Sequence, residues 1–370
     1  MSQEIEVQSK DNGKREEAEV NPELLLSSYA YDRPDELIAQ HPAERRDASR
    51  MMVLKHGEAP QHRHVSDILE YLRPDDCLVI NNTRVIAARL YGAMKDTGSP
   101  VEILLLKRLN KTDWQVIAKP GKKLKAGRRI VFLPERLEAE SIGEEAEGVR
   151  ILHFYFKGIF EEILDEAGTV PLPPYIHEKL ADPERYQTVY SKINGSAAAP
   201  TAGLHFTQAL LQKIRDLGTD IAELTLHVGL GTFRPVHEDD VRDHQMHSEH
   251  FEMNQLCADK LNACRERGGR IVAIGTTSCR TLETVVDRKT GRFEARTGET
   301  SIFIYPGFKF AGMDALLTNF HLPESTLLML VSAFYGRERM LAAYREAVRE
   351  NYRFYSFGDC MLILPEGLEV

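Results

Sequence analysis

The sequence predicts a layered α/β protein, three-layer-like, with a small all-β barrel inserted into its main domain. Strand and helix patterns alternate from about residue 200 to the end of the 370-residue chain, which is typical of a layered α/β domain. From Cys77 to Phe156, in contrast, short β-rich runs follow one another without intervening helices, as in a small barrel or sandwich. We therefore expect a discontinuous, candidate catalytic α/β domain (residues 23–65 and 161–370) around a barrel of residues 66–160.

The composition indicates a globular protein of the cytoplasm. Hydrophobic residues make up 42% and charged residues 28% of the chain, as in ordinary globular domains. No apolar run reaches the length of a membrane span, and the N-terminus lacks the apolar core of a secretory signal. The 5 cysteines are scattered without a Cys-x-x-Cys pair, which favours reduced thiols. We expect a cytoplasmic protein without membrane association, and a polar, disordered N-terminal tail over residues 1–22.

Local signals place the elements of the α/β domain. Leu210, Leu211 and Ile214 recur at helical spacing, Thr207 precedes them as a candidate N-cap, and Gly218 follows as a stop. The same reasoning predicts strands over 221–228, 270–275, 313–318 and 360–364, and helices over 254–267, 279–287, 323–335 and 337–351.

The remaining segments are assigned by their β-rich or polar character. We expect barrel strands over 78–81, 86–91, 101–106, 114–118, 129–133 and 149–156. The acidic segment 135–147 is weakly patterned, so we interpret it as a surface excursion. Residues 23–38 are interpreted as a short strand followed by a turn.

Polar side chains follow three of the predicted strands in the α/β domain. His227 precedes Gly229 at the end of one strand, Thr276 and Thr277 follow the second, and Asn319 and His321 follow the third. Ligands of open α/β sheets bind beyond the carboxyl ends of the strands, so these side chains converge if the strands are neighbours. The alternative is that each loop only caps its own helix.

Two basic segments can bind anions. The net charge is −9, but the run from Lys107 to Arg129 carries nine basic side chains and one acid, Asp113. Arg45 and Arg46 form part of a second cluster, and guanidinium groups pair bidentately with phosphate or carboxylate. A solvated loop and local salt bridges are the alternative interpretations.

The histidine-rich segment around His247 raises the question of a metal. His244, His247 and His250 are spaced three apart and could ligate zinc or iron. The surrounding pattern favours an exposed polar connection, so we predict no metal site. The chain also lacks a P-loop, a complete dinucleotide-binding fingerprint and a Gly-x-Ser-x-Gly elbow.

Eight motifs, in chain order, carry a resemblance to a known family. They are Ile38–Pro42 with Arg45–Asp47, Asn81–Ile86, Pro200–Thr207, Leu226–Val236, His247–Glu249, Gly275–Ser278, Leu317–Pro323 and Tyr355–Asp359. Together they closely resemble the S-adenosylmethionine:tRNA ribosyltransferase-isomerases of the queuosine pathway, from about residue 24 to residue 364. Two departures are Asn82, where the family pattern has Asp, and Cys279, where it has an aliphatic residue, so we assign Asn82 no acid/base role.

The resemblance implies an enzyme that transfers and isomerises the ribosyl part of S-adenosylmethionine onto 7-aminomethyl-7-deazaguanine at the tRNA wobble position. Epoxyqueuosine-tRNA is formed, and adenine and methionine are released. The resemblance also implies an α/β domain with an inserted barrel, and no metal or cofactor beyond S-adenosylmethionine, which is consumed as a substrate. The implied partners are S-adenosylmethionine and the anticodon loop of tRNA, and we expect a monomer.

This chemistry needs a base for the methylene next to the sulfonium, a hydrogen-bond donor for the departing adenine and an acceptor near the attacking amine. The catalytic candidates are His205, His227, His247, Glu249 and His321. The candidates for substrate binding are Arg45, Arg46, Thr83, Arg84, Thr201, Gly203, Gly229, Gly231, Thr232, Thr276, Thr277, Arg280 and Asn319. The candidates for tRNA binding are Lys119, Lys122, Lys123, Lys125 and Arg128. A non-enzymatic RNA-binding adaptor and a metal-dependent hydrolase are alternatives, but neither explains the complete order of motifs.

Overall fold

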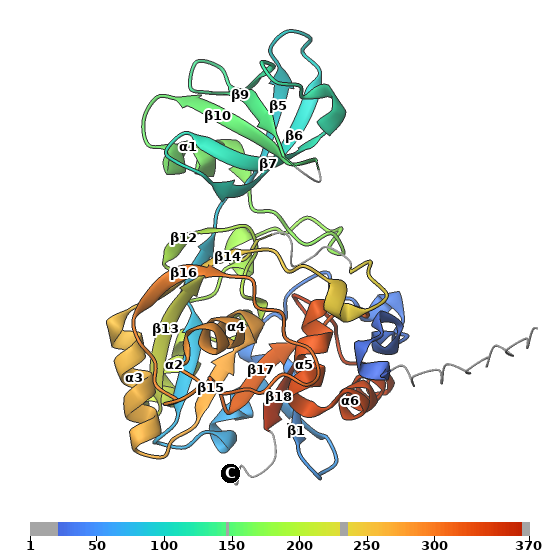
Figure 1. Cartoon of the computed structure of the whole chain (residues 1–370), viewed down its shortest axis with the longest axis vertical. Coiled ribbons are helices and arrows are strands. Elements are labelled where there is room, and N and C mark those ends of the chain that lie inside the picture. The colour runs from blue at the N-terminus through green and yellow to red at the C-terminus, as the bar shows by residue number, and fades with distance from the viewer. Residues whose placement is uncertain (1–20, 146–147, 230–235, 365–370) are drawn as a thin grey trace, which may run out of the picture.

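The computed structural model shown in Figure 1 describes residues 21–145, 148–229 and 236–364. A small barrel stands on a larger main domain, and only a few chain segments connect the two. Most of the expected N-terminal tail lies outside the described residues. No helix in the described part of the chain is long and apolar enough to cross a membrane.

A nine-stranded sheet forms the centre of the main domain, in the order β16-β14-β13-β3-β15-β17-β18-β1-β2. Its strands are β1 (Arg50–Lys55), β2 (Gln61–His64), β3 (Cys77–Asn81), β13 (Asp220–Leu226), β14 (Glu249–Met253), β15 (Ile271–Ile274), β16 (Arg296–Thr300), β17 (Ala315–Asn319) and β18 (Cys360–Leu364). The neighbours β13, β3, β15 and β17 run parallel to one another. Their carboxyl ends therefore lie at one edge of the sheet.

Helices cover both faces of this sheet, as the residues of β3 illustrate. Cys77 and Val79 pack into the hydrophobic core that contains α3 to α6, whereas Leu78 and Ile80 pack into the core that contains α2. Successive residues of a strand point to opposite faces, so a strand that is apolar throughout needs cover on both sides. The helices are α2 (Gln208–Asp216), α3 (Gln255–Glu266), α4 (Gly275–Val285), α5 (Thr326–Tyr335) and α6 (Arg337–Arg349). The prediction of a layered α/β domain is confirmed.

The local signals for α2 act as expected. The hydroxyl of Thr207 accepts a hydrogen bond from the Leu210 amide at 3.1 Å, which pairs one of the free amides of the first turn. Gly218 follows the helix with φ of +99°, in the left-handed region that glycine tolerates best. The predicted start and stop of this helix are confirmed.

The inserted module is a closed, antiparallel barrel of six strands, as predicted. Its order is β5-β6-β7-β10-β9-β8, and a further pairing of β5 with β8 closes it. The strands are β5 (Arg89–Met94), β6 (Pro100–Arg108), β7 (Asp113–Lys119), β8 (Arg129–Leu133), β9 (Leu137–Glu144) and β10 (Arg150–Phe156). In β7 the side chains of Trp114, Val116 and Ala118 alternate into the core. Helix α1 (Phe160–Ala167) packs on the same core and leads to the short strand β11 (Gly168–Thr169), which pairs with β5.

Three predictions about individual elements are wrong. Strand β3 was expected in the barrel, but it pairs with β13 and β15 in the large sheet, so the barrel strands begin at Arg89 rather than near residue 66. The acidic segment 135–147 was expected to be a surface excursion, but it contains the barrel strand β9, whose Leu137 and Ala139 are buried. In place of the strand expected within residues 23–38, the chain forms the short 3-10 helices Pro22–Leu24, Leu26–Tyr29 and Asp35–Leu37.

The barrel strand β5 leaves the main domain directly after a connecting segment at residues 85–88. This segment begins in β4 (Thr83–Val85), which pairs in parallel with β12 (Ile193–Ser196) to form a two-stranded ribbon. Because β5 starts at the main domain, the turns after β5 and β7 lie at the far end of the barrel. The basic turn after Lys119 thus follows the end of β7 that points away from the main domain.

Candidate active site between the sheet edge and the barrel

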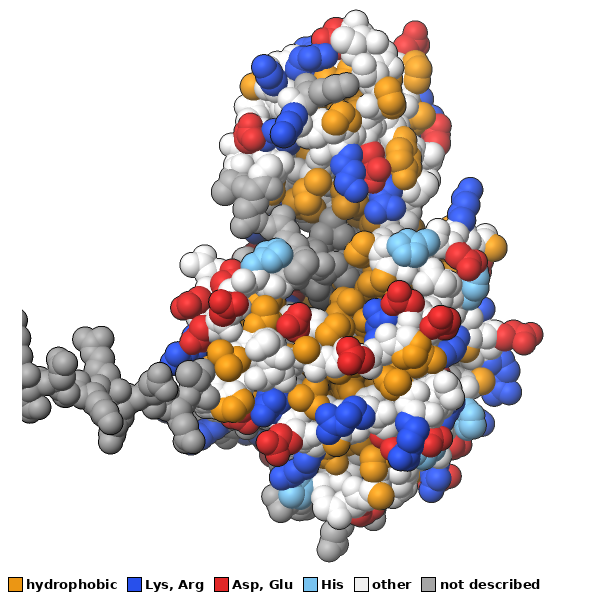
Figure 2. Space-filling view, turned by 90° about the vertical axis from the view of Figure 1, so that its right-hand side faces the viewer, with side chains coloured by type: hydrophobic (Ala, Val, Ile, Leu, Met, Phe, Trp, Pro, Cys, Tyr) orange, Lys and Arg blue, Asp and Glu red, His pale blue; other side chains and the backbone are white. Residues whose placement is uncertain are grey.

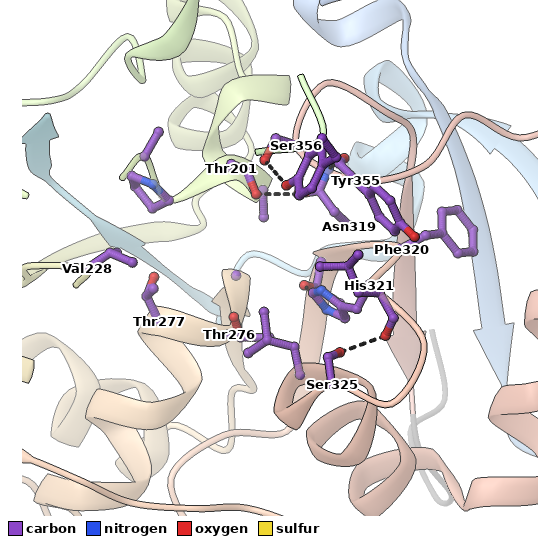
Figure 3. Close-up of a pocket in the computed structure, with 18 residues that line it drawn as sticks. Thr201, Val228, Thr276, Thr277, Asn319, Phe320, His321, Ser325, Tyr355 and Ser356 are labelled. Atoms are coloured by element: carbon purple, nitrogen blue, oxygen red, sulfur yellow. Dashed lines mark hydrogen bonds between the residues drawn. The ribbon is translucent and has the colours of Figure 1, made fainter. Parts of the chain in front are cut away.

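A small cavity of about 70 Å³ lies beyond the carboxyl ends of the parallel strands; we call it the strand-end cavity (Figure 3). Thr276, Thr277, Asn319 and His321 line it, which confirms the convergence predicted for these four side chains. His227, the fifth, lies outside its lining. Thr318 and Val228 also line this cavity, and Val228 marks the end at which a second cavity begins.

Asn319 organises one wall of the strand-end cavity. Its Oδ1 accepts a hydrogen bond from the Thr201 hydroxyl at 3.0 Å, and its Nδ2 donates to the Tyr355 carbonyl at 3.1 Å and to Nε2 of His205 at 3.2 Å. His205 is 3% exposed and does not line the strand-end cavity. Burial lowers the pKa of His205 to about 3, so this ring is neutral at physiological pH.

The N-terminus of α4 opens into the same cavity. Gly275 begins the helix with φ of +84°, and Ile274 at the N-cap position provides no side-chain hydrogen bond to the amides of the first turn. Thr276 is 8% exposed, and the buried hydroxyl of Thr277 has no hydrogen-bond partner among the described residues. Free amides and hydroxyls at a helix N-terminus suit an anionic or strongly polar ligand group.

Two tyrosines that the sequence did not single out as site residues also line this cavity. The rings of Tyr175 and Tyr355 lie 4.8 Å apart, and both line the strand-end cavity. Tyr355 has φ of +70°, which is uncommon for a residue with a bulky side chain and occurs preferentially at functional sites. The Tyr355 hydroxyl is held by Nε of Arg33 at 2.6 Å. The sequence signal for Tyr355 was its place in the last of the eight motifs.

His321 stays neutral inside this cavity. Its Nε2 lies 3.1 Å from the hydroxyl of Thr318, and its backbone amide donates to the Tyr344 hydroxyl at 2.8 Å. Burial lowers the pKa of His321 to about 3. A neutral imidazole fixed in this way can exchange hydrogen bonds with a ligand without adding charge.

The second cavity, of about 350 Å³, lies between the main domain and the barrel; we call it the inter-domain cavity. The main domain contributes His227, Gly229 and Glu249, and Val228 lines both cavities. Side chains absent from our predicted set also line it, namely Lys107, Arg108 and Trp114 from the barrel, and Ser248, His250 and Glu299 from the main domain. Their contribution depends on how the barrel is oriented, which no local pattern encodes.

His227 is held in this cavity from two sides. The Thr83 hydroxyl lies 2.8 Å from Nδ1, and the His250 ring stacks on the His227 ring at a centroid distance of 6.0 Å. Gly195 has φ of +152°, and a Cβ atom there would lie only 2.7 to 2.9 Å from three ring atoms of His227. Burial, together with the neighbouring His250, lowers the pKa of His227 to about 4.

Glu249 forms the charged floor of the inter-domain cavity. One carboxylate oxygen pairs with Arg280, and the other accepts the Gly229 amide at 2.9 Å and lies 3.2 Å from Nε2 of His247. Burial alone would raise the pKa of this carboxyl group, but Arg280, His247 and the Gly229 amide outweigh burial and lower it to about 2. Glu249 is therefore an ionised anchor, and Arg280 faces this carboxylate rather than either cavity.

The lining of both cavities lacks four residues that were predicted to bind substrate, namely Arg45, Arg46, Arg84 and Gly203. Arg45 pairs with Asp47 at 3.2 Å on the surface. Arg46 donates to the backbone carbonyls of Leu204 at 3.1 Å and of Glu184 at 3.0 Å.

The other two are Arg84 and Gly203. Arg84 donates to the Ser191 hydroxyl at 3.0 Å and pairs with Glu184. Gly203 allows the Tyr190 side chain to approach the backbone closely, because a Cβ atom at this position would lie 2.1 Å from the Tyr190 hydroxyl. We interpret Arg46, Arg84 and Gly203 as residues that shape the wall behind the cavities. Gly231 and Thr232 lie outside the described residues.

The side chains of the predicted tRNA-binding loop differ in exposure and in ion pairing. Lys119, Lys122 and Lys125 are exposed, and Arg128 pairs with Asp96 at 2.7 Å. The side chain of Lys123 lies outside the described part. The described side chains Lys119, Lys122, Lys125 and Arg128 do not line the strand-end or inter-domain cavity.

The three spaced histidines do not gather around a common point. Each approaches a different carboxylate, and the pairs are His244 with Glu238, His247 with Glu249 and His250 with Glu299. In the described part of the chain, no group of three or more His, Cys, Asp or Glu side chains is placed to hold a metal ion.

A family model described as queuosine biosynthesis protein matches residues 26–363, which is most of the chain. The chain belongs to this family. It is also similar to a solved structure described as S-adenosylmethionine tRNA ribosyltransferase from Thermotoga maritima, with 42% sequence identity and a TM-score of 0.53. That match covers 91% of this chain and 100% of the other. The family membership proposed from the eight motifs is therefore confirmed.

Proposed function

We propose that the protein transfers and isomerises the ribosyl moiety of S-adenosylmethionine onto 7-aminomethyl-7-deazaguanine at the tRNA wobble position. Epoxyqueuosine-tRNA is formed, and adenine and methionine are released. Membership of the queuosine biosynthesis family over residues 26–363 carries this proposal. The site supports it, because two adjoining cavities can bring together two different substrates.

His227 is the favoured base for the methylene next to the sulfonium. A base must be neutral before it takes the proton, and the lowered pKa of His227, about 4, keeps its ring neutral at physiological pH. It lines the inter-domain cavity next to Val228, where that cavity meets the strand-end cavity. The sulfonium acidifies the C–H bond, so a weak base suffices.

The other candidate histidines receive different roles. His321 lines the strand-end cavity and is suited to hydrogen bonding with S-adenosylmethionine. His205 contributes by holding Asn319. His247 supports Glu249, which anchors the Gly229 amide in the inter-domain cavity.

The wobble base enters from the barrel side. The chemistry requires this base to leave the anticodon stack, because its aminomethyl group must reach the ribose carbon. The inter-domain cavity is open to both domains and offers the carboxylates Glu161, Glu249 and Glu299 beside Lys107 and Arg108. Such a mixture suits a base that carries an amine next to a phosphodiester chain.

Adenine release tests the proposal directly. The purified protein is incubated with S-adenosylmethionine and tRNA that carries 7-aminomethyl-7-deazaguanine, and free adenine and the nucleoside mass are followed. We expect adenine only when that tRNA is present, with a matching mass increase on the nucleoside. A folded protein that binds this tRNA but releases no adenine would instead favour an RNA-binding adaptor.

Three further properties belong to the same proposal. We expect no metal or additional cofactor, so activity is unchanged by a chelator, and S-adenosylmethionine is consumed as a substrate. We expect a monomer, which sedimentation measurements check. We expect the protein to act in the cytoplasm, where its tRNA substrate is found.

A further inference from the structure

A third and larger hollow lies at the waist between the barrel and the main domain, with a volume of about 1040 Å³. The barrel strands contribute Arg89 and Tyr91 of β5 and Lys119 of β7, and the connector of residues 170–184 forms the opposite wall. We call it the waist groove. Figure 2 shows one face of the molecule, with the barrel above the main domain.

The barrel wall of the waist groove carries an ordered row of side chains. Tyr91 and Lys119 both lie directly opposite Glu102 in the pairing of β5, β6 and β7. Glu102 is bound by Arg89 at 3.2 Å, so Tyr91 and Lys119 flank a carboxylate whose charge is already paired. Tyr91 is 56% exposed, which makes it the most exposed aromatic among the large hydrophobic side chains of the described chain.

The charges of the waist groove leave an excess of available cations. Arg84 and Glu184 pair with each other, and Glu178 pairs with His41 at 2.6 Å. Lys119 and Lys179 are exposed, and no ion pair is found for either among the described residues. Asp165 is the one acidic lining residue of the described groove without such a pair. An exposed aromatic ring beside free lysines is the arrangement with which proteins hold single-stranded nucleic acid.

The waist groove adjoins the proposed active site. Val85 and Ala87 line the groove, whereas Ile86 between them lines the inter-domain cavity, so the two hollows lie on opposite sides of one connecting segment. They meet at Asn194, which lines both. Asn194 and its neighbour Ile193 are exposed on β12. A strand of RNA that bends around this exposed edge reaches both hollows.

We propose that anticodon-loop nucleotides next to the wobble base lie in the waist groove, with a base stacked on Tyr91 and phosphates at Lys119 and Lys179. This inference rests on the proposed function and names the surface that holds its RNA substrate. The waist groove replaces the basic loop as the main RNA contact, since Lys119 lines the groove and the described side chains of Lys122, Lys125 and Arg128 do not.

The test uses the full-length protein and an anticodon stem-loop RNA that carries 7-aminomethyl-7-deazaguanine. Affinity is measured by titration at several salt concentrations, and the KM for this RNA is taken from adenine release. Tyr91→Ala should weaken RNA binding about tenfold with little change in salt dependence, because a stacking contact is lost. Lys119→Ala with Lys179→Ala should lower the slope of log affinity against log salt by about 1.4, or about 0.7 for each phosphate on a single strand.

Matched controls come from the barrel itself. Tyr155 is 42% exposed but lines none of the three hollows, and Lys157 is exposed outside them. Tyr155→Ala and Lys157→Ala should bind the RNA like the unaltered protein. S-adenosylmethionine binding, measured without RNA, reports whether each variant is folded.

Three results would decide against the inference. If both groove variants bind the RNA with wild-type affinity, the waist groove is not an RNA-binding surface. Equal weakening by Tyr155→Ala and Tyr91→Ala would indicate a general loss of barrel stability. If a variant with Lys122→Ala and Lys125→Ala weakens RNA binding more than the groove variants do, the basic loop is the main RNA contact. Absence of adenine from the unaltered protein would instead contradict the proposed function, so the two failures are distinguishable.

Discussion

The hydroxyl oxygen of Thr83 lies 2.8 Å from Nδ1 of His227 and 3.5 Å from the carbonyl oxygen of Ile193. When the Thr83 hydroxyl donates to the Ile193 carbonyl, its oxygen accepts a hydrogen bond from the N–H at Nδ1 of His227. In this tautomer, Nε2 of His227 carries a free lone pair. The backbone amide of Thr83 is in turn held by Asn81 at 3.1 Å. Thr83 therefore acts as a positioning residue for His227, although the sequence led us to expect substrate binding.

Replacing Thr83 by Val should slow catalysis without weakening substrate binding. Val keeps the shape of Thr but removes the hydroxyl that fixes the His227 ring. We expect kcat to fall by up to about 100-fold, the lower range of what a general base contributes, with KM values nearly unchanged. Thr83→Ser should restore most of the rate, and equal losses in both variants would show that only packing matters at this position.

Replacing Gly195 by Ala should also impair His227, by a steric route. The new Cβ would lie within 2.9 Å of the imidazole ring, and φ of +152° disfavours any side chain. We expect adenine release to fall at least about tenfold, because the ring must leave its place beside the cavity. Gly57→Ala is the matched control, since Gly57 has φ of +79° but no atom lies within 4 Å of the position that a Cβ would take there. Normal activity in Gly195→Ala would contradict the role of the His227 position.

Replacing Glu249 by Gln should destabilise the main domain. The substitution leaves the buried guanidinium of Arg280, which is 4% exposed, without its counter-charge. Loss of one partner from a buried ion pair costs about 3–5 kcal/mol. Urea unfolding followed by far-UV circular dichroism measures the change. Glu161→Gln, which breaks the exposed pair with Arg108, should cost less than about 1 kcal/mol, and equal losses would contradict the assignment of Glu249 as a buried anchor.

Stability should fall as the pH is lowered below about 6.5. His205 and His321 have pKa values of about 3 in the folded protein, so the unfolded chain binds protons that the folded chain does not. Their full contribution is present above the unfolded pKa of about 6.5 and is lost as the pH falls towards the folded pKa. Each histidine should contribute a slope of about 1.4 kcal/mol per pH unit within this window.

His205→Gln isolates one of these contributions. Unfolding free energies measured between pH 6 and pH 5 should depend on pH less steeply in this variant, whatever its stability at neutral pH. His41→Gln, at a histidine whose side chain is 60% exposed, is the control. An unchanged slope in His205→Gln would mean that the buried ring takes up a proton without difficulty.

Much of the fold could be predicted because its signals are local. The N-cap at Thr207, the stop at Gly218 and the apolar run of β18 (Cys360–Leu364) each depend on neighbours in the sequence. The assignment of β3 failed because an apolar strand does not encode which sheet it joins. Its partner β13 lies far along the chain, and this pairing is set by the packing of the whole domain. In β9, glutamates on the outer face obscured the alternation of Leu137 and Ala139.

The site was predictable to the extent that it follows from strand ends. Thr276, Asn319 and His321 were placed correctly because parallel strands bring their carboxyl ends to one edge. Gly203 and Arg46 lie outside the lining of both cavities, and substrate binding by them stays a prediction, because a glycine or an arginine in a motif can serve close packing as well as a ligand. The inter-domain cavity could not be foreseen, since it exists only where β6 and Trp114 of the barrel face the sheet edge.

The pairing of β5 with β11 places Gly168 opposite Leu90, so the chain enters and leaves the barrel at the same point. When the two ends of an inserted domain lie together, the insertion adds only a small loop-closure entropy cost to the folding of the domain that carries it. The barrel of residues 89–169 is thus an insertion that the main domain can accommodate without separating its own flanking segments. Joining the flanking segments directly should leave the main sheet foldable, but it would remove Lys107, Arg108 and Trp114 from the inter-domain cavity.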